Sequence, residues 1–451
     1  MTKLDVHTNS SGLGRRVRIA LGASVFLGIL YGFMVFLLWL AYVGWLPGSN
    51  HLLSGRTIHS FHRYWVHYSR LFLVISAGLT FGVCLVVGLR LWVRRVGGWR
   101  RFWPRFAFSV FLTLLLAELV LRMALLNPQL PLRPLQNPSL VASSFSDEAW
   151  WVLGYRHAYS DMKLTEIAHP LLGNCQERPR KDNPLGLYMH ARERLGGEGP
   201  RILFFGDSFV HGMPFNQTTL PEMVEAQLAD GRPVANLGVR GYGIDQMYLL
   251  AQELGTPRQG DTVLVGVLTW DIDRTVFSFM FGQKPRFVVQ DGALRLSNIP
   301  FQASNQEFLD SFKVSYPSFL IQALKRKWAR LRNLDLVEGG QAEEKRKITK
   351  AILTQWNREI ASAGAQMTVI LFHTRQDLAT RDWRNDVVRE TCGGLGVPLL
   401  DTADVLLPYL RERNSYGEEL YEPNDFHHTD LANQLMAAQI AAYLRNDGTP
   451  E

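Results

Sequence analysis

Three long apolar stretches in the first third of this 451-residue sequence constrain its fold more than any other feature. They cover residues 19–46, 71–93 and 106–126. Each is about 20 residues or longer, which is the length that a helix needs to cross a hydrocarbon core of about 30 Å. The first stretch is too long for the apolar region of a cleaved signal peptide and lacks an obvious cleavage site. The sequence therefore predicts a membrane region over residues 1–126 with three transmembrane helices.

Basic residues gather around these apolar stretches. Residues 1–145 contain fifteen Lys and Arg against two acidic residues, whereas the rest of the chain contains 33 basic and 39 acidic residues. The amino-terminal tail and the loop after the second stretch hold nine of the basic residues, and the first loop holds three. The positive-inside rule then places the amino terminus in the cytoplasm and, after three crossings, the large carboxy-terminal domain outside the cytoplasmic (inner) membrane, in the periplasm or its equivalent. Because that domain has no basic excess, we expect no nucleic-acid partner.

The end of the membrane region carries two charges and is followed by prolines. Glu118 and Arg122 lie four residues apart, so they share one helix face. We expect them to neutralise each other, and an interface with a membrane partner is the alternative. Four prolines between residues 128 and 138 predict an extended, stiff linker at the start of a pre-domain segment over 127–199.

From residue 200 onward, short apolar runs alternate with helical patterns. Apolar runs without polar alternation, separated by helices, are typical of a parallel sheet covered on both faces. A final helix is predicted at about 430–444, and an insertion at about 272–345 contains a predicted hairpin whose turn is Asp291-Gly292. The predicted strands cover residues 202–205, 234–237, 263–268, 367–372 and 397–400.

The tripeptide Gly206-Asp207-Ser208 follows the first predicted strand. Ligands bind at the carboxyl edge of such sheets, so a serine here is placed to act as a nucleophile. The same three residues also make a turn and cap a helix in many loops, and the tripeptide alone favours that second interpretation.

A second polar cluster, Asp425-Phe426-His427-His428, stands just before the last predicted helix. An Asp and a His on one loop supply the carboxylate and the general base that a serine nucleophile needs. Adjacent histidines are also common in exposed loops, and a metal pair is conceivable. Since no further Cys or His cluster supports a metal, we expect neither a metal nor another cofactor.

The chain order of these motifs resembles that of SGNH/GDSL hydrolases over residues 200–445. Phe205-Gly206-Asp207-Ser208-Phe209 resembles the first block of the family, Asn236 to Gly241 the second, and His427 to Ala432 the last. The resemblance implies a flavodoxin-like three-layer α/β domain over residues 200–451, with Ser208 as nucleophile and with the backbone N–H groups of Ser208 and Gly241 in the oxyanion hole.

The resemblance leaves the base and the oxyanion hole partly open. Counting from the last helix selects His427 as the base, with Asp425 as its carboxylate, whereas the Asp-x-x-His spacing of the family selects His428. We prefer His427. The third block of the family, Gly-Asn-Asp, aligns with Thr269-Trp270-Asp271, so the side-chain amide that binds the oxyanion in the family is replaced by Trp270.

The predicted function is a membrane-anchored, extracytoplasmic serine esterase that acts on acyl esters, O-acetyl groups above all, of cell-envelope glycans or lipids. The alternatives are an O-acyltransferase that modifies polysaccharides, supplied by a membrane-bound acyl-donor partner, and a binding or assembly protein with weak catalysis. Cys175 and Cys392 lie in the outer domain and could form a disulfide bond in an oxidising compartment.

Overall fold

The computed structural model describes residues 99–446 apart from several short segments. The segments left out are residues 131, 133–134, 144–145, 158–168, 302–303, 332–340, 380, 416 and 424. The chain divides into two compact units, Met1–Leu114 and Leu115–Glu451. The sheet and the candidate site belong to the second unit.

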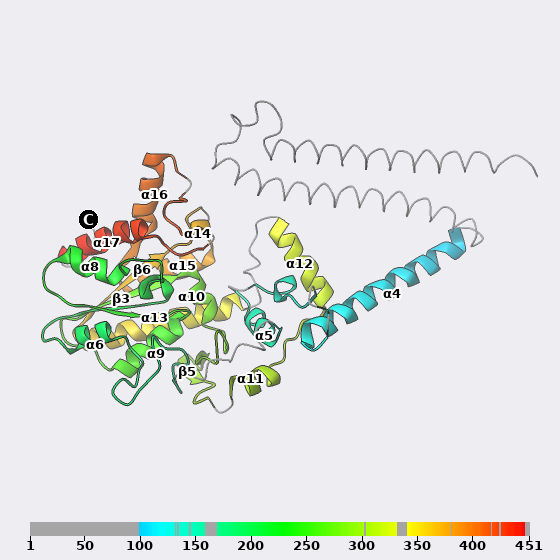
Figure 1. The fold of residues 1–451 in the computed structure, drawn as a ribbon, viewed down its shortest axis with the longest axis horizontal. Coiled ribbons are helices and arrows are strands. Elements are labelled where there is room, and N and C mark those ends of the chain that lie inside the picture. The colour runs from blue at the N-terminus through cyan, green and yellow to red at the C-terminus, as the bar shows by residue number, and fades with distance from the viewer. Residues whose placement is uncertain are drawn as a thin grey trace, which may run out of the picture. The chain divides into compact units, whose positions relative to one another are not determined.

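A five-stranded parallel sheet forms the centre of the second unit (Figure 1). Its strand order is β2-β1-β3-β6-β7, the flavodoxin-like order in which the first strand lies inside the sheet. β1 pairs with both neighbours, so Phe205 stands beside Leu237 and Val265. The strands are β1 Ile202–Gly206, β2 Val234–Gly238, β3 Thr262–Leu268, β6 Gln366–Phe372 and β7 Leu399–Asp401.

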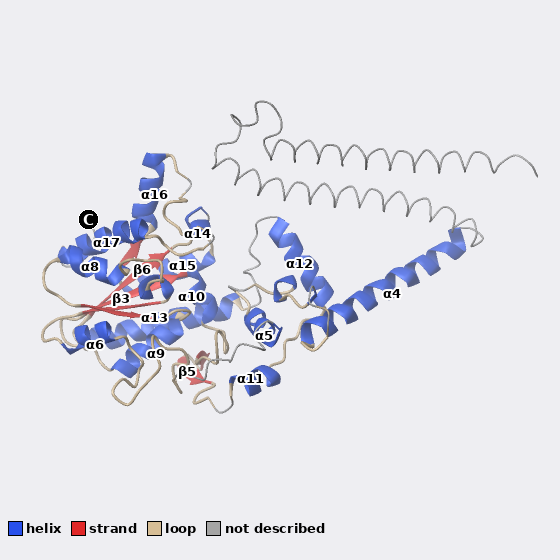
Figure 2. Ribbon diagram, in the orientation of Figure 1, coloured by secondary structure: helices blue, strands red, loops and turns tan. Residues whose placement is uncertain are grey.

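Helices cover both faces of this sheet (Figure 2). α8 (Leu220–Leu228) and α17 (Asp430–Arg445) cover one face, and α9 (Ile244–Leu254), α13 (Ala342–Ser362) and α15 (Trp383–Leu395) cover the other. Successive residues of β1 point to opposite sides, with Leu203 and Phe205 in one core and Ile202 and Phe204 in the other. A strand buried on both faces needs apolar residues throughout, and this confirms the predicted three-layer α/β domain.

The remaining elements lie around this three-layer core. The hairpin of β4 (Arg286–Gln290) and β5 (Ala293–Ser297) confirms the predicted one, and its two turn residues, Asp291 and Gly292, both have positive φ. The other elements are the 3-10 helix η2 Pro138–Leu140 and the helices α5 Glu148–His157, α6 Met189–Gly196, α7 Ser208–His211, α10 Thr269–Arg274, α11 Asn305–Ser311, α12 Phe319–Leu331, α14 Arg375–Ala379 and α16 Ala403–Arg413.

A third, smaller core joins the proline-containing segment to the insertion. Val141 and Leu153, which follow the prolines in the predicted pre-domain segment, are fully buried against Phe279, Leu309 and Phe319. The prolines do prevent a long helix there, and the leucines between them, Leu130, Leu132 and Leu135, are only partly buried. The residues after Pro138 pack into the core. Leu121 and Leu125 of the preceding helix belong to the same core.

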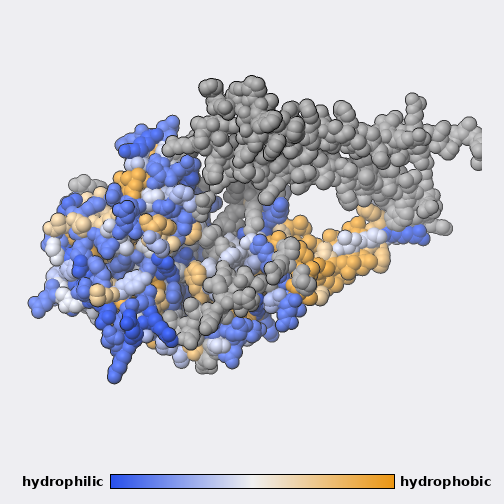
Figure 3. Space-filling model, viewed as in Figure 1, coloured by the Kyte–Doolittle hydropathy of each residue, from blue (hydrophilic) through white to orange (hydrophobic). Residues whose placement is uncertain are grey.

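α4 (Trp99–Leu126) contains the third predicted transmembrane helix. Its residues Trp103–Leu126 are long and apolar enough to cross a membrane, and most of that stretch is not buried by the protein. Figure 3 shows hydrophobic residues along this helix. The other two predicted spans, 19–46 and 71–93, lie outside the described residues, so among the described residues one helix meets these criteria.

Candidate active site

Ser208 is the first residue of the short helix α7, directly after β1 and Asp207. Asp207 caps this helix, because its Oδ1 accepts a hydrogen bond of 2.9 Å from the N–H of Phe209. Gly206 permits the sharp turn, since a Cβ there would lie 2.3 Å from Cγ2 of Val210. The capping and nucleophile interpretations of the tripeptide are therefore compatible: Asp207 caps the helix, and Ser208 begins it.

His427 and Asp425 meet Ser208 from the loop before α17. The Oγ of Ser208 lies 2.7 Å from Nε2 of His427, and Nδ1 of His427 lies 2.5 Å from Oδ1 of Asp425. These distances assign the imidazole tautomer: Nδ1–H donates to Asp425, and Nε2 accepts from the serine hydroxyl. Ser208 and His427 are each 7% exposed, so both are nearly shielded from water yet can be reached.

The electrostatics of Asp425 suit a carboxylate that orients a base. Burial by itself would raise its pKa, but the hydrogen bonds from the side chain and the backbone N–H of His427, and from the N–H of Phe426, lower it below the ordinary value. Asp425 therefore stays ionised at neutral pH, which suits it to stabilise a positive charge on the His427 ring.

His428, the alternative base, has a different environment. Its Nε2 donates to the carbonyl oxygen of His373 at 3.1 Å, and its ring packs on Phe209 and Tyr421. Burial lowers its pKa to about 3, so it stays neutral. Of the two adjacent histidines, the structure places His427 on Ser208. His428 lies within the hydrophobic core beside the loop.

His211, three residues after Ser208, also has a structural environment. Its Nδ1 lies 3.1 Å from the carbonyl oxygen of Gly238, and its ring packs beside Tyr188. Burial lowers its pKa. The imidazole thus links α7 to the end of β2.

Aromatic rings surround the imidazole of His427. Its ring centroid lies 4.2 Å from that of Phe426, 5.1 Å from Phe209 and 6.4 Å from Phe215. Trp270 packs on the far side of Phe426, with ring centroids 4.8 Å apart. The Trp270 side chain, at the position of the family's side-chain amide, is 8% exposed. Through Phe426 it belongs to the group of apolar rings around His427.

Gly241 lies in the loop after β2 and has a φ of +78°, which side chains other than glycine rarely adopt. A Cβ at this position would also lie 2.6 Å from the ring of Phe281. Both constraints require glycine here. Its proposed part in an oxyanion hole, together with the N–H of Ser208, stays a prediction.

Arg274 connects the three loops that follow β1, β2 and β3. Its Nη1 donates to Oδ2 of Asp207 at 3.0 Å, to the carbonyl oxygen of Tyr242 at 2.8 Å and to Oδ1 of Asp271 at 2.5 Å. All three side chains in this charged group are almost fully buried. Burial and the charge of Asp207 raise the pKa of Asp271 well above its ordinary range, while Arg274 opposes that shift. Sequence reasoning missed this group, although the i, i+3 spacing of Asp271 and Arg274 was a usable signal.

A second buried ion pair lies next to this group. Nζ of Lys284, in the insertion, donates to Oδ2 of Asp245 at 2.6 Å and to the carbonyl oxygen of Arg274 at 2.7 Å. Lys284 therefore helps to fix the backbone position of Arg274. A lysine so fully buried is retained only with such partners, since an unpaired charge would be very costly.

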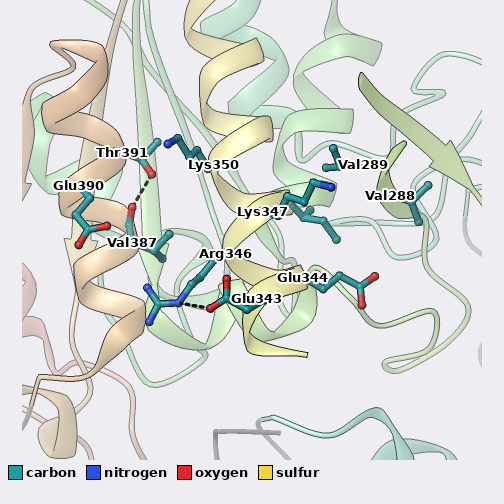
Figure 4. A pocket seen from close by; sticks show the side chains of 11 residues that line it. Val288, Val289, Glu343, Glu344, Arg346, Lys347, Lys350, Val387, Glu390 and Thr391 are labelled. Atoms are coloured by element: carbon teal, nitrogen blue, oxygen red, sulfur yellow. Dashed lines mark hydrogen bonds and ion pairs between the residues drawn. The ribbon is translucent and has the colours of Figure 1, made fainter. Parts of the chain in front are cut away.

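Two surface pockets lie away from Ser208. The larger, of about 610 Å³, is lined by charged residues of α13 and α15 and by β4 (Figure 4). The smaller, of about 340 Å³, lies between α9, α13 and the sheet. Neither is lined by Ser208, Asp425 or His427. The candidate site is therefore assigned from hydrogen-bond geometry.

The described residues contain no group of three His, Cys, Asp or Glu side chains that could hold a metal ion. Cys175 and Cys392 are both free thiols in the structure, and burial raises the pKa of each to about 12. Neither thiol is therefore activated as a nucleophile at neutral pH.

Comparison with protein-family models and with curated proteins finds no match to this sequence. Comparison with solved structures finds similar chains. A Bacillus subtilis protein, YXIM, is 12% identical with a TM-score of 0.33, and the match covers 56% of this chain and 57% of that one. A member of the lipolytic G-D-S-L family from Veillonella parvula is 13% identical with a TM-score of 0.32, covering 55% of this chain and all of that one.

A further similar structure is a two-domain esterase active on acetylated mannans, at 11% identity and a TM-score of 0.32. The match covers 59% of this chain and 55% of that one, so this chain spans little more than half the length of that esterase and of the Bacillus protein. This chain has an SGNH/GDSL hydrolase-like fold by its own geometry, whatever the identities and TM-scores. Its sheet has the strand order described above, Ser208 follows the first strand, and Asp425 and His427 precede the last helix.

Proposed function

We propose that this chain is a membrane-anchored, extracytoplasmic serine esterase that removes acyl groups, O-acetyl groups above all, from glycans or lipids of the cell envelope. One observation carries the chemistry: Ser208, His427 and Asp425 form a continuous hydrogen-bonded chain of 2.7 Å and 2.5 Å. Side chains that lie more than two hundred residues apart in sequence meet there in the order nucleophile, base and orienting carboxylate.

The geometry supports a two-step ester cleavage. Oγ of Ser208 attacks the carbonyl carbon while Nε2 of His427 takes the hydroxyl proton. The carbon–oxygen bond to the alcohol then breaks, and His427 returns the proton to the leaving oxygen. Water, deprotonated by the same imidazole, next attacks the acyl-serine and releases the acid together with free Ser208. Asp425 holds the imidazole throughout.

The proposed oxyanion hole has one donor fewer than that of the SGNH/GDSL family. We expect the backbone N–H groups of Ser208 and Gly241 to bind the oxyanion. Trp270 offers no amide at the third position, and the loss of one such donor typically costs a factor of about 10²–10³ in rate. We therefore expect slow turnover of simple esters.

The cellular setting of the proposal comes from α4 and from the charge pattern. A helix long and apolar enough to cross a membrane leads directly into the second unit. The excess of basic residues lies in the predicted cytoplasmic tail and loop. A domain held on the outer face would meet envelope glycans and lipids, and the substrate class rests on this location.

A second candidate is an O-acyltransferase that passes the acyl group to a sugar hydroxyl, supplied by a membrane-bound acyl donor. The aromatic rings of Phe209, Phe215 and Phe426 around His427 favour it, because they limit the access of water to an acyl-serine. An acceptor alcohol that fills this apolar site would then compete well with water.

A fluorophosphonate probe tests the nucleophile in the purified full-length protein. We expect the wild type to be labelled, Ser208→Ala to lose all labelling, and the control Ser143→Ala, which alters another buried serine, to keep it. Labelling of Ser208→Ala at the wild-type level, or an unlabelled but folded wild type, would overturn the proposal. Acetate release from an activated ester, with and without a sugar acceptor, then separates esterase from transferase.

A further inference from the structure

α12 (Phe319–Leu331) is a two-faced helix that the candidate active site does not use. One face is buried and includes Phe319 and Ala329. The other face carries Ile321, Leu324 and Trp328, which are 56%, 61% and 57% exposed. Because these residues are spaced by three and four positions, they form one apolar stripe along the helix. A stripe of three large apolar side chains exposed to water on a soluble domain needs an explanation.

The start of α12 is fixed to α4 by the partly exposed carboxylate of Glu118. The two carboxylate oxygens of Glu118 accept hydrogen bonds from Oγ of Ser318 at 2.9 Å, from the N–H of Phe319 at 3.1 Å and from the N–H of Leu320 at 2.8 Å. The guanidinium of Arg122 also lies 4.9 Å above the ring of Phe319. Glu118 thus caps α12 and binds Arg122, and this confirms the predicted pairing of the two charges.

This attachment sets the position of α12 along α4. Glu118 lies eight residues before the end of α4 at Leu126, which corresponds to about 12 Å of helix. If α4 crosses a membrane, its last turns lie in the interfacial layer of the outer leaflet. Figure 1 shows α12 leading away from these last turns instead of running along them.

The composition of α12 fits a lipid surface. Lys325 and Lys327 are exposed on either side of the apolar stripe, and the helix contains no acidic residue. A tryptophan and long apolar residues on one face, flanked by lysines, are typical of helices that lie in the plane of a membrane interface. The lysines complement anionic headgroups, which distinguishes a lipid surface from an uncharged protein groove.

We propose that α12 lies in the membrane interface beside α4, with Ile321, Leu324 and Trp328 among the acyl chains and Lys325 and Lys327 at anionic phosphates. The proposal rests on the proposed membrane anchoring through α4. α12 adds an attachment to the membrane surface besides the proposed crossing by α4. Together the two helices hold the domain in one orientation to the membrane surface.

The test places an environment-sensitive fluorescent amino acid at position 324 of the full-length chain, incorporated during translation. The control carries the same fluorophore at Glu343, whose side chain is 94% exposed on α13. Both proteins are reconstituted into phosphatidylcholine vesicles, with or without phosphatidylglycerol, that contain a lipid with a nitroxide near its headgroup.

We expect the nitroxide lipid to quench the emission at position 324 strongly and that at position 343 hardly at all. Quenching at position 324 should decrease without phosphatidylglycerol, and also in the double variant Lys325→Glu/Lys327→Glu. Equal quenching at the two positions would overturn the proposal. A blue-shifted but unquenched emission at position 324 would also overturn it, because a protein partner would then cover the stripe. Fluorophosphonate labelling of Ser208 in the same vesicles reports the esterase site separately.

Discussion

At the scale of single residues, the neighbouring histidines His427 and His428 have the same side chain but different hydrogen-bond partners. His427 has a carboxylate on one ring nitrogen and a serine hydroxyl on the other. His428 has a backbone carbonyl on one nitrogen and a desolvated ring whose pKa is lowered to about 3. A proton acceptor must be able to become cationic, and only His427 has a partner that stabilises that charge.

Substitution of each histidine by glutamine separates these roles. His427→Gln removes the base, so kcat/KM for an activated ester should fall by about 10²–10⁴. His428→Gln should keep near wild-type turnover per folded molecule and lose about 1–3 kcal/mol of stability, because its buried hydrogen bond is disturbed. Ester hydrolysis together with urea unfolding measures both effects. An inactive but stable His428→Gln would reverse the assignment of the base.

Glu148 makes the stability of the domain depend on pH. Burial raises its pKa to about 7, although Oε1 accepts a hydrogen bond from the N–H of Ser278. In the unfolded chain this pKa is ordinary, near 4.5, so the folded state holds the extra proton between these values. The protonated Glu148 carboxyl is therefore the form that favours the folded state. Its contribution to stability is fully present below about pH 4.5 and is lost as the pH rises to about 7.

The variant Glu148→Gln keeps an acceptor for Ser278 and removes the titration. The free energy of unfolding of the wild type, measured by thermal unfolding, should fall by about 2 kcal/mol between these pH values, after allowance for partial exposure. The variant should lose clearly less over the same range. Identical pH profiles for the two proteins would show that Glu148 does not titrate in this range.

At the scale of elements, the site is built where three parallel strands end. β1, β2 and β3 deliver Asp207, Tyr242 and Asp271 to one sheet edge, and Arg274 hydrogen-bonds to all three. Ser208 and Gly241 stand next to two of these partners in sequence. Arg274 therefore helps to fix the loop of Ser208, the proposed nucleophile, relative to the loop of Gly241.

Loss of this guanidinium should affect both stability and labelling. Arg274→Met leaves two buried carboxylates without their cation, which typically costs about 3–5 kcal/mol. It should also slow fluorophosphonate labelling of the protein that remains folded. Arg201→Met is the matched control, because Arg201 forms a comparable buried pair with Asp261 at 2.6 Å, next to the amino end of β1. If both variants slow labelling equally, Arg274 has only a structural role.

Most elements could be predicted from the sequence because their patterns are local. The predicted final helix at about 430–444 and the hairpin on either side of Asp291-Gly292 are confirmed within a residue. The last strand, at the edge of the sheet, covers Leu399–Asp401 instead of the predicted 397–400. Which residues of the pre-domain segment bury could not be predicted, because the burial of Val141 and Leu153 depends on distant residues such as Phe319.

At the scale of the whole molecule, the chain has an apolar, basic amino-terminal third and a slightly acidic remainder. The positive balance belongs to residues 1–145, whereas the rest carries a small acidic excess. α4 ends in the third core through Leu121 and Leu125, so the helix proposed to cross the membrane is also part of the folded domain. We expect movements of α4 to be transmitted to α12 and the insertion.

The proposed orientation is tested by a reporter fused after Glu451. Alkaline phosphatase folds only outside the cytoplasm, so its fusion should be active, whereas a green fluorescent protein fusion at the same place should be dark. A matched fusion in the predicted cytoplasmic loop, after Arg101, should give the opposite pair of results. A fluorescent, phosphatase-inactive fusion after Glu451 would place the domain inside and contradict the proposed location.

The sequence by itself determined the layered parallel sheet, the apolar α4 and the two short motifs that contain Ser208 and His427, because periodicity, apolar runs and chain order are local properties. Tertiary structure alone decided that His427 contacts Ser208, that Arg274 connects three loops and that α12 leaves one apolar face exposed. These outcomes depend on contacts between residues far apart in the chain. Such contacts are set by how the elements pack, and no local pattern records them.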